Sequence, residues 1–452
     1  MTTIEKRAAS SLAAIFAFRM LGLFMILPVF VLYAEDLHGV TPVKVGLAIG
    51  IYGLTQALFQ IPFGMLSDRF GRKPLLLIGL IIFAIGSVIA GYADTIDGVI
   101  LGRAIQGAGA VAAVILALLA DLTSEEHRTK AMAFIGMSIG FSFIGAMVLG
   151  PFFSHFFGVH GLFYITALMA VAGIVILYLL VPDPPPSRFH RDTTLSPTLI
   201  GHVLRNRQLL RLDFGIFVLH LTLTASFMMI PLKLRELGLE EVDTSLFYLP
   251  VMVLAMVMMV PLIIIGEKWR RLKEVFLLSI VTLLLVVLAI ALGSPDLWWM
   301  AVLLCIYFTA FNLLEASLPS LISKFSPVTS KGTAMGLYTS SQFLGAFTGG
   351  ALGGVIYGLW GEVALLSGCA ALLLIWALLA LTMESPRYLV PRLVNIGQSQ
   401  SEDEEHQLFH QISAIDGVVE VTINGEEGIA YLKVDSQHLD EAELFKYSVK
   451  AT

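Results

Sequence analysis

Residues 64–73, GMLSDRFGRK, form a polar decapeptide between two long apolar stretches, 45–63 and 74–92. A hydrocarbon core of roughly 30 Å needs about 20 predominantly apolar residues to be crossed as a helix, and each stretch approaches that length. The sequence therefore predicts a tight cytoplasmic hairpin between two membrane-spanning helices, anchored at the membrane surface by its charged side chains.

The composition is that of an integral membrane protein. Of the 452 residues, 57% are hydrophobic and only 14% are charged, against roughly 25% charged residues in an average soluble domain. Apolar runs predict twelve spanning helices, and an even number places both termini on one side. The runs cover residues 10–33, 45–66, 74–93, 98–120, 131–154, 161–181, 210–232, 244–265, 274–293, 297–322, 333–358 and 363–383.

Orientation follows from the basic residues. If both termini lie in the cytoplasm, the outer loops contain only Lys44, Lys233 and Arg235 of the 28 Lys and Arg residues, as the positive-inside rule requires. Cys305 and Cys369 both lie in apolar runs, so we expect neither a disulfide framework nor a metal site.

The two halves of the predicted bundle repeat each other. Pro62 and the charged pattern at 68–72 recur as Pro261 and the pattern at 267–271. Parallel repeats of this kind are typical of one large class of secondary transporters. We expect an N-terminal six-helix half at 1–181, a cytoplasmic linker at 182–209 and a C-terminal six-helix half at 210–383.

Residues 384–452 differ in character, because charged and polar residues replace the apolar runs. Alternation and turn residues predict the order strand, helix, strand, strand, helix. This part resembles the ferredoxin-like metal-binding domain of copper chaperones but lacks its two cysteines, so metal transport by that route is not expected. We expect a small α+β cytoplasmic domain that makes a regulatory or dimer contact. The elements are expected at 388–396, 402–415, 418–424, 428–435 and 438–445.

Three segments carry a family resemblance. GMLSDRFGRKPLL resembles the loop 2–3 signature of the major facilitator superfamily. LGRAIQGAGA at 101–110 is similar to the helix 4 motif of its drug:proton antiporter branch, and LGLFMILP at 21–28 is similar to that branch's helix 1 pattern. Helix 5 departs from the branch, because Ala146 stands at an expected glycine. The resemblance covers 10–383 and implies an all-α fold of two pseudo-symmetric halves in the bacterial inner membrane.

The decapeptide is predicted to form a gate on the cytoplasmic side. Gly64 and Gly71 permit close backbone approach, and Asp68 can face the positive N-terminus of a neighbouring helix. The resemblance implies that this is the helix that begins near Thr333. The alternative is a positively charged anchor without a gating role. That alternative leaves an acid between two glycines unexplained.

Basic residues extend the predicted gate to neighbouring groups. Arg72 can pair with Asp121 at the inner end of helix 4, while Arg69 and Lys73 can reach anionic lipid phosphates. The gating residues are therefore expected to be Gly64, Asp68, Arg69, Gly71, Arg72, Lys73 and Asp121.

Ionisable residues inside the predicted spans mark the candidate site, since a charge at the bilayer centre costs at least roughly 2.5 kcal/mol. They are Arg19, Arg103, His220 and Glu315, in helices 1, 4, 7 and 10. These helices line a central cavity in the superfamily. Glu315, His220 and, by the resemblance, Arg103 are the candidate proton-coupling residues. The alternatives are that Arg19 reaches the headgroups, that Arg103 bonds to helix 1 carbonyls and that His220 is a hydrogen-bonded packing residue.

A substrate site is expected beside these groups. Asn312 shares a helix face with Glu315 at a spacing of three residues, and nearby aromatic and Met side chains offer an adaptable apolar wall. Packing or lipid contact is the ordinary alternative for such side chains. The expected substrate residues are Arg19, Asn312, Tyr307, Phe311 and Met228.

These features favour a proton-coupled transporter that exports amphipathic or drug-like molecules. Nutrient or sugar uptake by symport, or a membrane sensor that signals through the C-terminal domain, are the alternatives. The chain shows no phosphate-binding loop and no nucleophile elbow, which argues against an enzyme or an ATP-driven pump. We expect a small-molecule substrate, protons and membrane lipids as partners, with no cofactor beyond the proton gradient and no nucleic acid.

Overall fold

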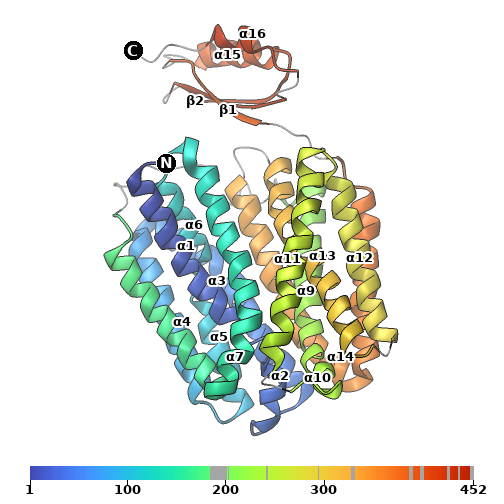
Figure 1. The fold of residues 1–452 in the computed structure, drawn as a ribbon. Coiled ribbons are helices and arrows are strands. Elements are labelled where there is room, and N and C mark those ends of the chain that lie inside the picture. Colours follow the sequence, from blue (N-terminus) through green and yellow to red (C-terminus); the bar gives the residue numbers. More distant parts are fainter. Residues whose placement is uncertain are drawn as a thin grey trace.

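The computed structural model describes residues 1–183, 201, 203–240, 243–293, 295–326, 331–385, 390–397, 402–424, 428–435 and 438–447. Most of them form a bundle of long helices, and a small domain with a three-stranded sheet lies at one end (Figure 1). The N-terminus lies at the same end of the bundle. We call this end the domain face and the opposite end the far face. Most of the predicted linker 182–209 lies outside the described residues.

The bundle has two parts in sequence order. The first contains α1 (Thr3–Phe24), α2 (Phe30–Tyr33), the 3-10 turn η1 (Ala34–Asp36), α3 (Pro42–Phe70), α4 (Arg72–Tyr92), α5 (Ile96–Ala108), α6 (Ala112–Asp121) and α7 (Glu125–Leu179). The second contains α9 (Arg207–Phe227), α10 (Ile230–Glu236), α11 (Thr244–Lys268), α12 (Leu272–Leu292), α13 (Leu297–Phe325) and α14 (Lys331–Leu381).

The predicted hairpin around the decapeptide is short. The first helix of the hairpin, α3, begins at its far end with Pro42, whose missing N–H costs nothing in the first turn. There the Thr41 hydroxyl accepts a hydrogen bond from the Lys44 N–H. Only Gly71 separates α3 from α4, and its φ of 94° is readily adopted by glycine alone. The decapeptide is therefore largely helical, with a one-residue turn.

Two helices are too long for one crossing. Among the described residues, ten helices are long and apolar enough to span a membrane, and two of these segments have 50 residues each. In α7, Ser124 N donates to Glu5 Oε1 before the helix, and Leu179 O accepts from Arg7 at its end. Both ends therefore lie beside the start of α1, so the chain doubles back. The reversal is at Gly158 in α7, and Gly361 breaks α14 in the same way.

Three predicted runs are interrupted instead of continuous. The run 10–33 divides into α1 and α2 around Pro28, and the run 210–232 divides into α9 and α10 just before Pro231. Proline lacks the N–H that would continue the helix. The run 98–120 divides into α5 and α6 at Gly109. The breaks at α1/α2 and α9/α10 occupy matching places in the two halves.

The halves approach most closely between α3 and α14. A Cβ atom on Gly46 would lie 2.1 Å from the Gly350 carbonyl oxygen, and one on Gly354 would lie 2.6 Å from that of Pro42. Small residues allow two helix backbones to pack this closely. Pro42 begins α3 on the far side from the Gly71 turn, so this contact joins the halves toward the far face.

The C-terminal domain forms its own core. Strands β1 (Val390–Asn395), β3 (Ile429–Val434) and β2 (Val418–Asn424) lie in that order, all antiparallel. Helices α15 (Glu402–Ser413) and α16 (Glu441–Phe445) complete the domain. The predicted order is therefore present, with α16 shorter than expected. The buried residues are Val394, Ile412, Ile415, Ala430, Leu432, Val434 and Leu444.

Candidate functional site

The decapeptide forms an ion network at the domain face. Arg72 Nε donates to Asp121 Oδ2 at 2.9 Å, and Arg72 Nη1 donates to Ser67 Oγ at 2.7 Å. The same guanidinium pairs with Asp68. One arginine thus links the end of α3, the start of α4 and the end of α6 within the first half.

Other gating candidates have different partners from those expected. Lys73 Nζ donates to the Val181 carbonyl at 2.7 Å and to Asp183 Oδ1 at 2.6 Å, where a lipid phosphate was expected. Arg69 lies over the Phe70 ring, with its guanidinium carbon 5.4 Å from the centroid. The expected partner of Asp68 was the start of α14, but residues 327–330 just before it lie outside the described residues.

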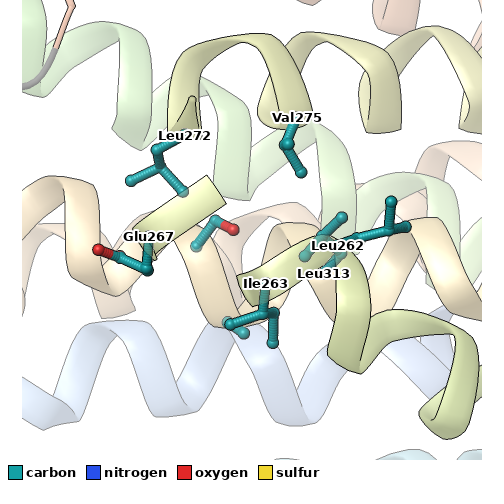
Figure 2. A pocket seen from close by; sticks show the side chains of 8 residues that line it. Leu262, Ile263, Glu267, Leu272, Val275 and Leu313 are labelled. Carbon is teal, nitrogen blue, oxygen red and sulfur yellow. The ribbon is translucent and has the colours of Figure 1, made fainter. Parts of the chain in front are cut away.

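The second half has a related contact with different chemistry. Glu267, the repeat counterpart of Asp68, accepts from Lys324 Nζ at 2.8 Å and from Ser320 Oγ at 3.1 Å. A small pocket of about 40 Å³ lies beside Glu267, among Leu262, Leu272 and other apolar side chains (Figure 2). Small-molecule sites usually exceed roughly 300 Å³, so this pocket is not a substrate site.

Arg19 lies in a polar cluster of the first half. Its Nη2 donates to Tyr52 Oη at 2.8 Å and also to Gln56 Oε1. The side chain is only 2% exposed. Arg19 therefore does not extend to the headgroups, which was one alternative.

Arg103 contacts the same tyrosine, Tyr52. Its guanidinium carbon is 5.0 Å from the Tyr52 ring centroid. Nη1 donates to Gln106 Oε1 at 2.6 Å, and the other nitrogens reach the carbonyls of Ala48 and Ile49. The alternative that placed its bonds on helix 1 carbonyls is wrong, because both carbonyl acceptors belong to α3 and the Gln106 side chain belongs to α5.

The second half brings His220 and Glu315 together. Gln342 Nε2 lies 2.9 Å from His220 Nε2 and 3.0 Å from Glu315 Oε1, and the His220 and Glu315 side chains approach to 3.8 Å. The three residues come from α9, α13 and α14. Sequence reasoning missed Gln342, because a neutral amide in an apolar run carries little signal.

Asp213 was also missed. It lies on α9 at 7% exposure, and its Oδ1 has no hydrogen-bond partner. Tyr338 of α14 lies within electrostatic range of both Asp213 and Glu315. An Asp inside the apolar run 210–232 was a readable signal, since intramembrane acids are rare.

Two of the expected substrate residues, Phe311 and Tyr307, lie in an aromatic cluster. Phe311 stacks on Tyr307 with centroids 6.3 Å apart and on Phe143 of the first half at 5.5 Å. Met228 is 2% exposed within the same hydrophobic core. Asn312 is less buried, and its Nδ2 has no partner. The Phe311 ring therefore lies where the halves meet.

Toward the far face, an ion pair joins the halves. Both guanidinium Nη atoms of Arg235 donate to the Glu35 carboxylate, at 2.8 and 2.9 Å. These hydrogen bonds lower the pKa of Glu35. Ser245 Oγ adds a bond to the Val148 carbonyl. These hydrogen bonds therefore join the halves toward the far face.

Comparison with known proteins identifies the family. The family model of the Major Facilitator Superfamily matches residues 12–350 and 261–401. The chain is 44% identical over 445 residues to the inner membrane transport protein YajR of Escherichia coli K12, covering 98% of this chain and 97% of the relative. It is 30% identical over 152 residues to a class B tetracycline resistance protein of Escherichia coli, covering 33% and 38%.

Solved structures agree on the fold. A bacterial homologue of the human lysosomal transporter Spinster has a TM-score of 0.65 at 16% identity, covering 84% of this chain and 97% of that one. The nucleoside transporter NupG has a TM-score of 0.66 at 15% identity, covering 83% and 99%. The predicted family is confirmed, and with it the expectation of a transporter and not an enzyme. This chain belongs to the major facilitator superfamily of membrane transporters.

Proposed function

We propose that the chain is a proton-coupled antiporter that exports amphipathic or drug-like molecules across the bacterial inner membrane. The observation that carries the proposal is the contact of Glu315 with His220 through Gln342. Two titratable side chains share one amide in the interior of a transporter, where an ionisable residue costs free energy and is kept for a purpose.

The coupling step follows from this geometry. Protonation of Glu315 removes a negative charge from the interior of the second half. A neutral site lowers the cost of bringing the halves together and changes the affinity for substrate, so proton uptake and substrate release become linked. His220 provides the second proton site, and Asp213 with Tyr338 extends the polar path toward the domain face.

Alternating access is proposed to use the two ends of the bundle in turn. Counting α7 and α14 as two spans each gives twelve helices, with both termini and the ferredoxin-like domain in the cytoplasm. The contacts of α3 with α14 and of Arg235 with Glu35 then close the outer side. The network around Arg72 shapes the inner gate, which closes in the other state.

Drug export is favoured by the antiporter-type motif at 101–110 and by the names of distant relatives. These include tetracycline and quinolone resistance proteins. The C-terminal domain is proposed to regulate transport or to mediate dimer contact, because it has its own core and lies outside the bundle.

The proposal is tested in proteoliposomes with the full chain. A pH gradient is imposed, and movement of tetracycline and norfloxacin is followed together with internal pH. Glu315→Gln is expected to abolish gradient-driven movement while the protein remains folded. Glu274→Gln on α12, where the side chain is 60% exposed, is the matched control and should transport normally.

One result would contradict the proposed role of Glu315. This result is that Glu315→Gln still moves substrate against a gradient with unchanged pH dependence. Glu315 is then not the proton site, and the role passes to His220 or Arg103. Absence of any proton movement with any substrate in the wild type would contradict antiport itself.

A further inference from the structure

Two arginines contact one tyrosine in the first half, and they differ in how well they are satisfied. Each side-chain nitrogen of Arg103 has a hydrogen-bond acceptor within 3.5 Å. Nε and Nη1 of Arg19 have no partner, although the side chain is 2% exposed. Arg103 is thus held by the protein, whereas Arg19 keeps two donors free.

No acid compensates the Arg19 charge. Among the described residues, no carboxylate forms a salt bridge with Arg19. The buried Glu5 of the first half accepts hydrogen bonds from Thr2 and Ser124 instead, and Asp213 and Glu315 belong to the second half. Buried charges in proteins are normally paired, because an unpaired one loses its hydration without return. An arginine cannot escape the cost by losing its proton. The charge of Arg19 is therefore not neutralised by any carboxylate among the described residues.

The surroundings of Arg19 are built for a polar ligand. Tyr52, Gln56 and Gln60 follow one another at a spacing of four residues, so they share a face of the apolar helix α3. Gln56 and Gln60 are 0% and 3% exposed. The Tyr52 ring also contacts Phe343 of the second half, with centroids 6.2 Å apart. The cluster thus lies one side chain from the junction of the halves, where transporters of this architecture bind substrate.

We propose that Arg19, with Tyr52 and Gln56, binds an oxyanion group of the transported molecule, such as a carboxylate or sulfonate. Nε and Nη1 point from different edges of the guanidinium, and each can donate a charge-assisted hydrogen bond to an oxygen of such a group. The inference rests on the proposed transport function but narrows it, since the substrate must carry a negative charge. Phe83 and Tyr52, whose centroids lie 5.9 and 6.0 Å from the guanidinium carbon, hold the Arg19 side chain in position.

The test is a binding measurement without any gradient. Purified full-length chain in detergent is dialysed to equilibrium against naphthalene-2-sulfonate or against the cationic 2-naphthyl-trimethylammonium. The wild type should bind the sulfonate at least tenfold more tightly. Arg19→Gln should weaken sulfonate binding at least tenfold, as expected for loss of a desolvated charge partner, and leave the ammonium probe within about threefold. Arg271→Gln makes the same charge change at an exposed position and should alter neither affinity.

Several results would overturn the inference. Equal affinity of the wild type for both probes would do so, as would sulfonate binding by Arg19→Gln at the wild-type affinity. If Arg19→Gln does not fold, Arg19→Lys keeps the charge without the planar fork, and it should retain the preference for the sulfonate while losing affinity. The probes also separate the two proposals. Anion preference without proton-driven transport contradicts antiport alone, and proton-driven transport of cations alone contradicts this inference.

Discussion

Replacing Arg72 with Gln removes the cation that two carboxylates share. The Arg72 side chain is 13% exposed, and those of Asp68 and Asp121 are 24% and 14% exposed, so water screens the three poorly. Removing one partner of a fully buried ion pair costs about 3–5 kcal/mol, and an exposed pair contributes under about 1 kcal/mol. The intermediate burial at Arg72 places the expected loss in the free energy of unfolding at about 2–3 kcal/mol.

The assay is thermal unfolding of the purified chain in detergent. For a folding unit of roughly 150–250 residues, the size of one half of the bundle, 1 kcal/mol shifts the midpoint of thermal unfolding by roughly 2–4 °C. Arg72→Gln should therefore unfold about 4–12 °C below the wild type. Lys324→Gln is the matched control. Its partner Glu267 is 43% exposed, so a smaller shift is expected. Adding Asp121→Asn to Arg72→Gln should recover part of the loss, because it removes an orphaned acid.

Two results would refute this reasoning. One is an Arg72→Gln midpoint indistinguishable from that of Lys324→Gln. The other is no recovery on adding Asp121→Asn. We also expect Arg72→Gln to reduce transport at equal expression, and a normal rate would leave the decapeptide as an anchor only.

Three further outcomes are expected. Deleting 397–452 should leave the membrane bundle folded, because the C-terminal domain has its own core. The truncated protein should elute from a gel-filtration column as a monodisperse peak at an unchanged volume and should still bind substrate; an unfolded bundle would show that the bundle needs the domain to fold. Arg235 lowers the pKa of Glu35, so the pair should contribute above the ordinary Glu pKa of about 4.3 and lose this contribution as pH falls through the lowered value. Both side chains are about 50% exposed, so the pair contributes below about 1 kcal/mol to the free energy of unfolding. The difference in unfolding midpoint between the wild type and Glu35→Gln should therefore disappear in acid, and a difference that persists would contradict this prediction. Gly46→Ala should destabilise the closed far face, since its Cβ meets a carbonyl at 2.1 Å, whereas Gly136→Ala, with open space, should unfold like the wild type.

The hairpin at 64–73 was predictable because it depends on simple terms. Charges between two apolar runs must lie at a membrane surface, and a glycine at the turn permits a φ of 94°. The contact between Arg72 and Asp121 was also anticipated from the sequence. Such features follow from spacing and charge along one chain, which sequence alone contains.

Other features depend on contacts that spacing does not reveal. The sequence predicted one span where the structure has α1 and α2, because the run 10–33 is apolar apart from Arg19. A proline within such a run permits a break but does not require one. The backbone carbonyls that accept hydrogen bonds from Arg103 belong to α3 and not to α1. The sequence could not show this, because helix packing decides which carbonyls a buried guanidinium reaches. The position of the Gln342 amide between His220 and Glu315 depends on the packing of three helices, which the sequence does not show.

The repeat anticipated how the halves are built but not how their charges differ. Helix packing depends on small and apolar residues that many sequences can supply, so duplicated halves keep one arrangement of helices. A polar contact depends on single residues and diverges freely. The first half now holds the buried cations Arg19 and Arg103, and the second holds the acids Asp213 and Glu315. In the proposed mechanism, a substrate between the halves meets a positive wall on one side and, on the other, a wall whose charge protons remove. On that proposal, the difference in charge between the halves, and not their shared fold, links the substrate to protons.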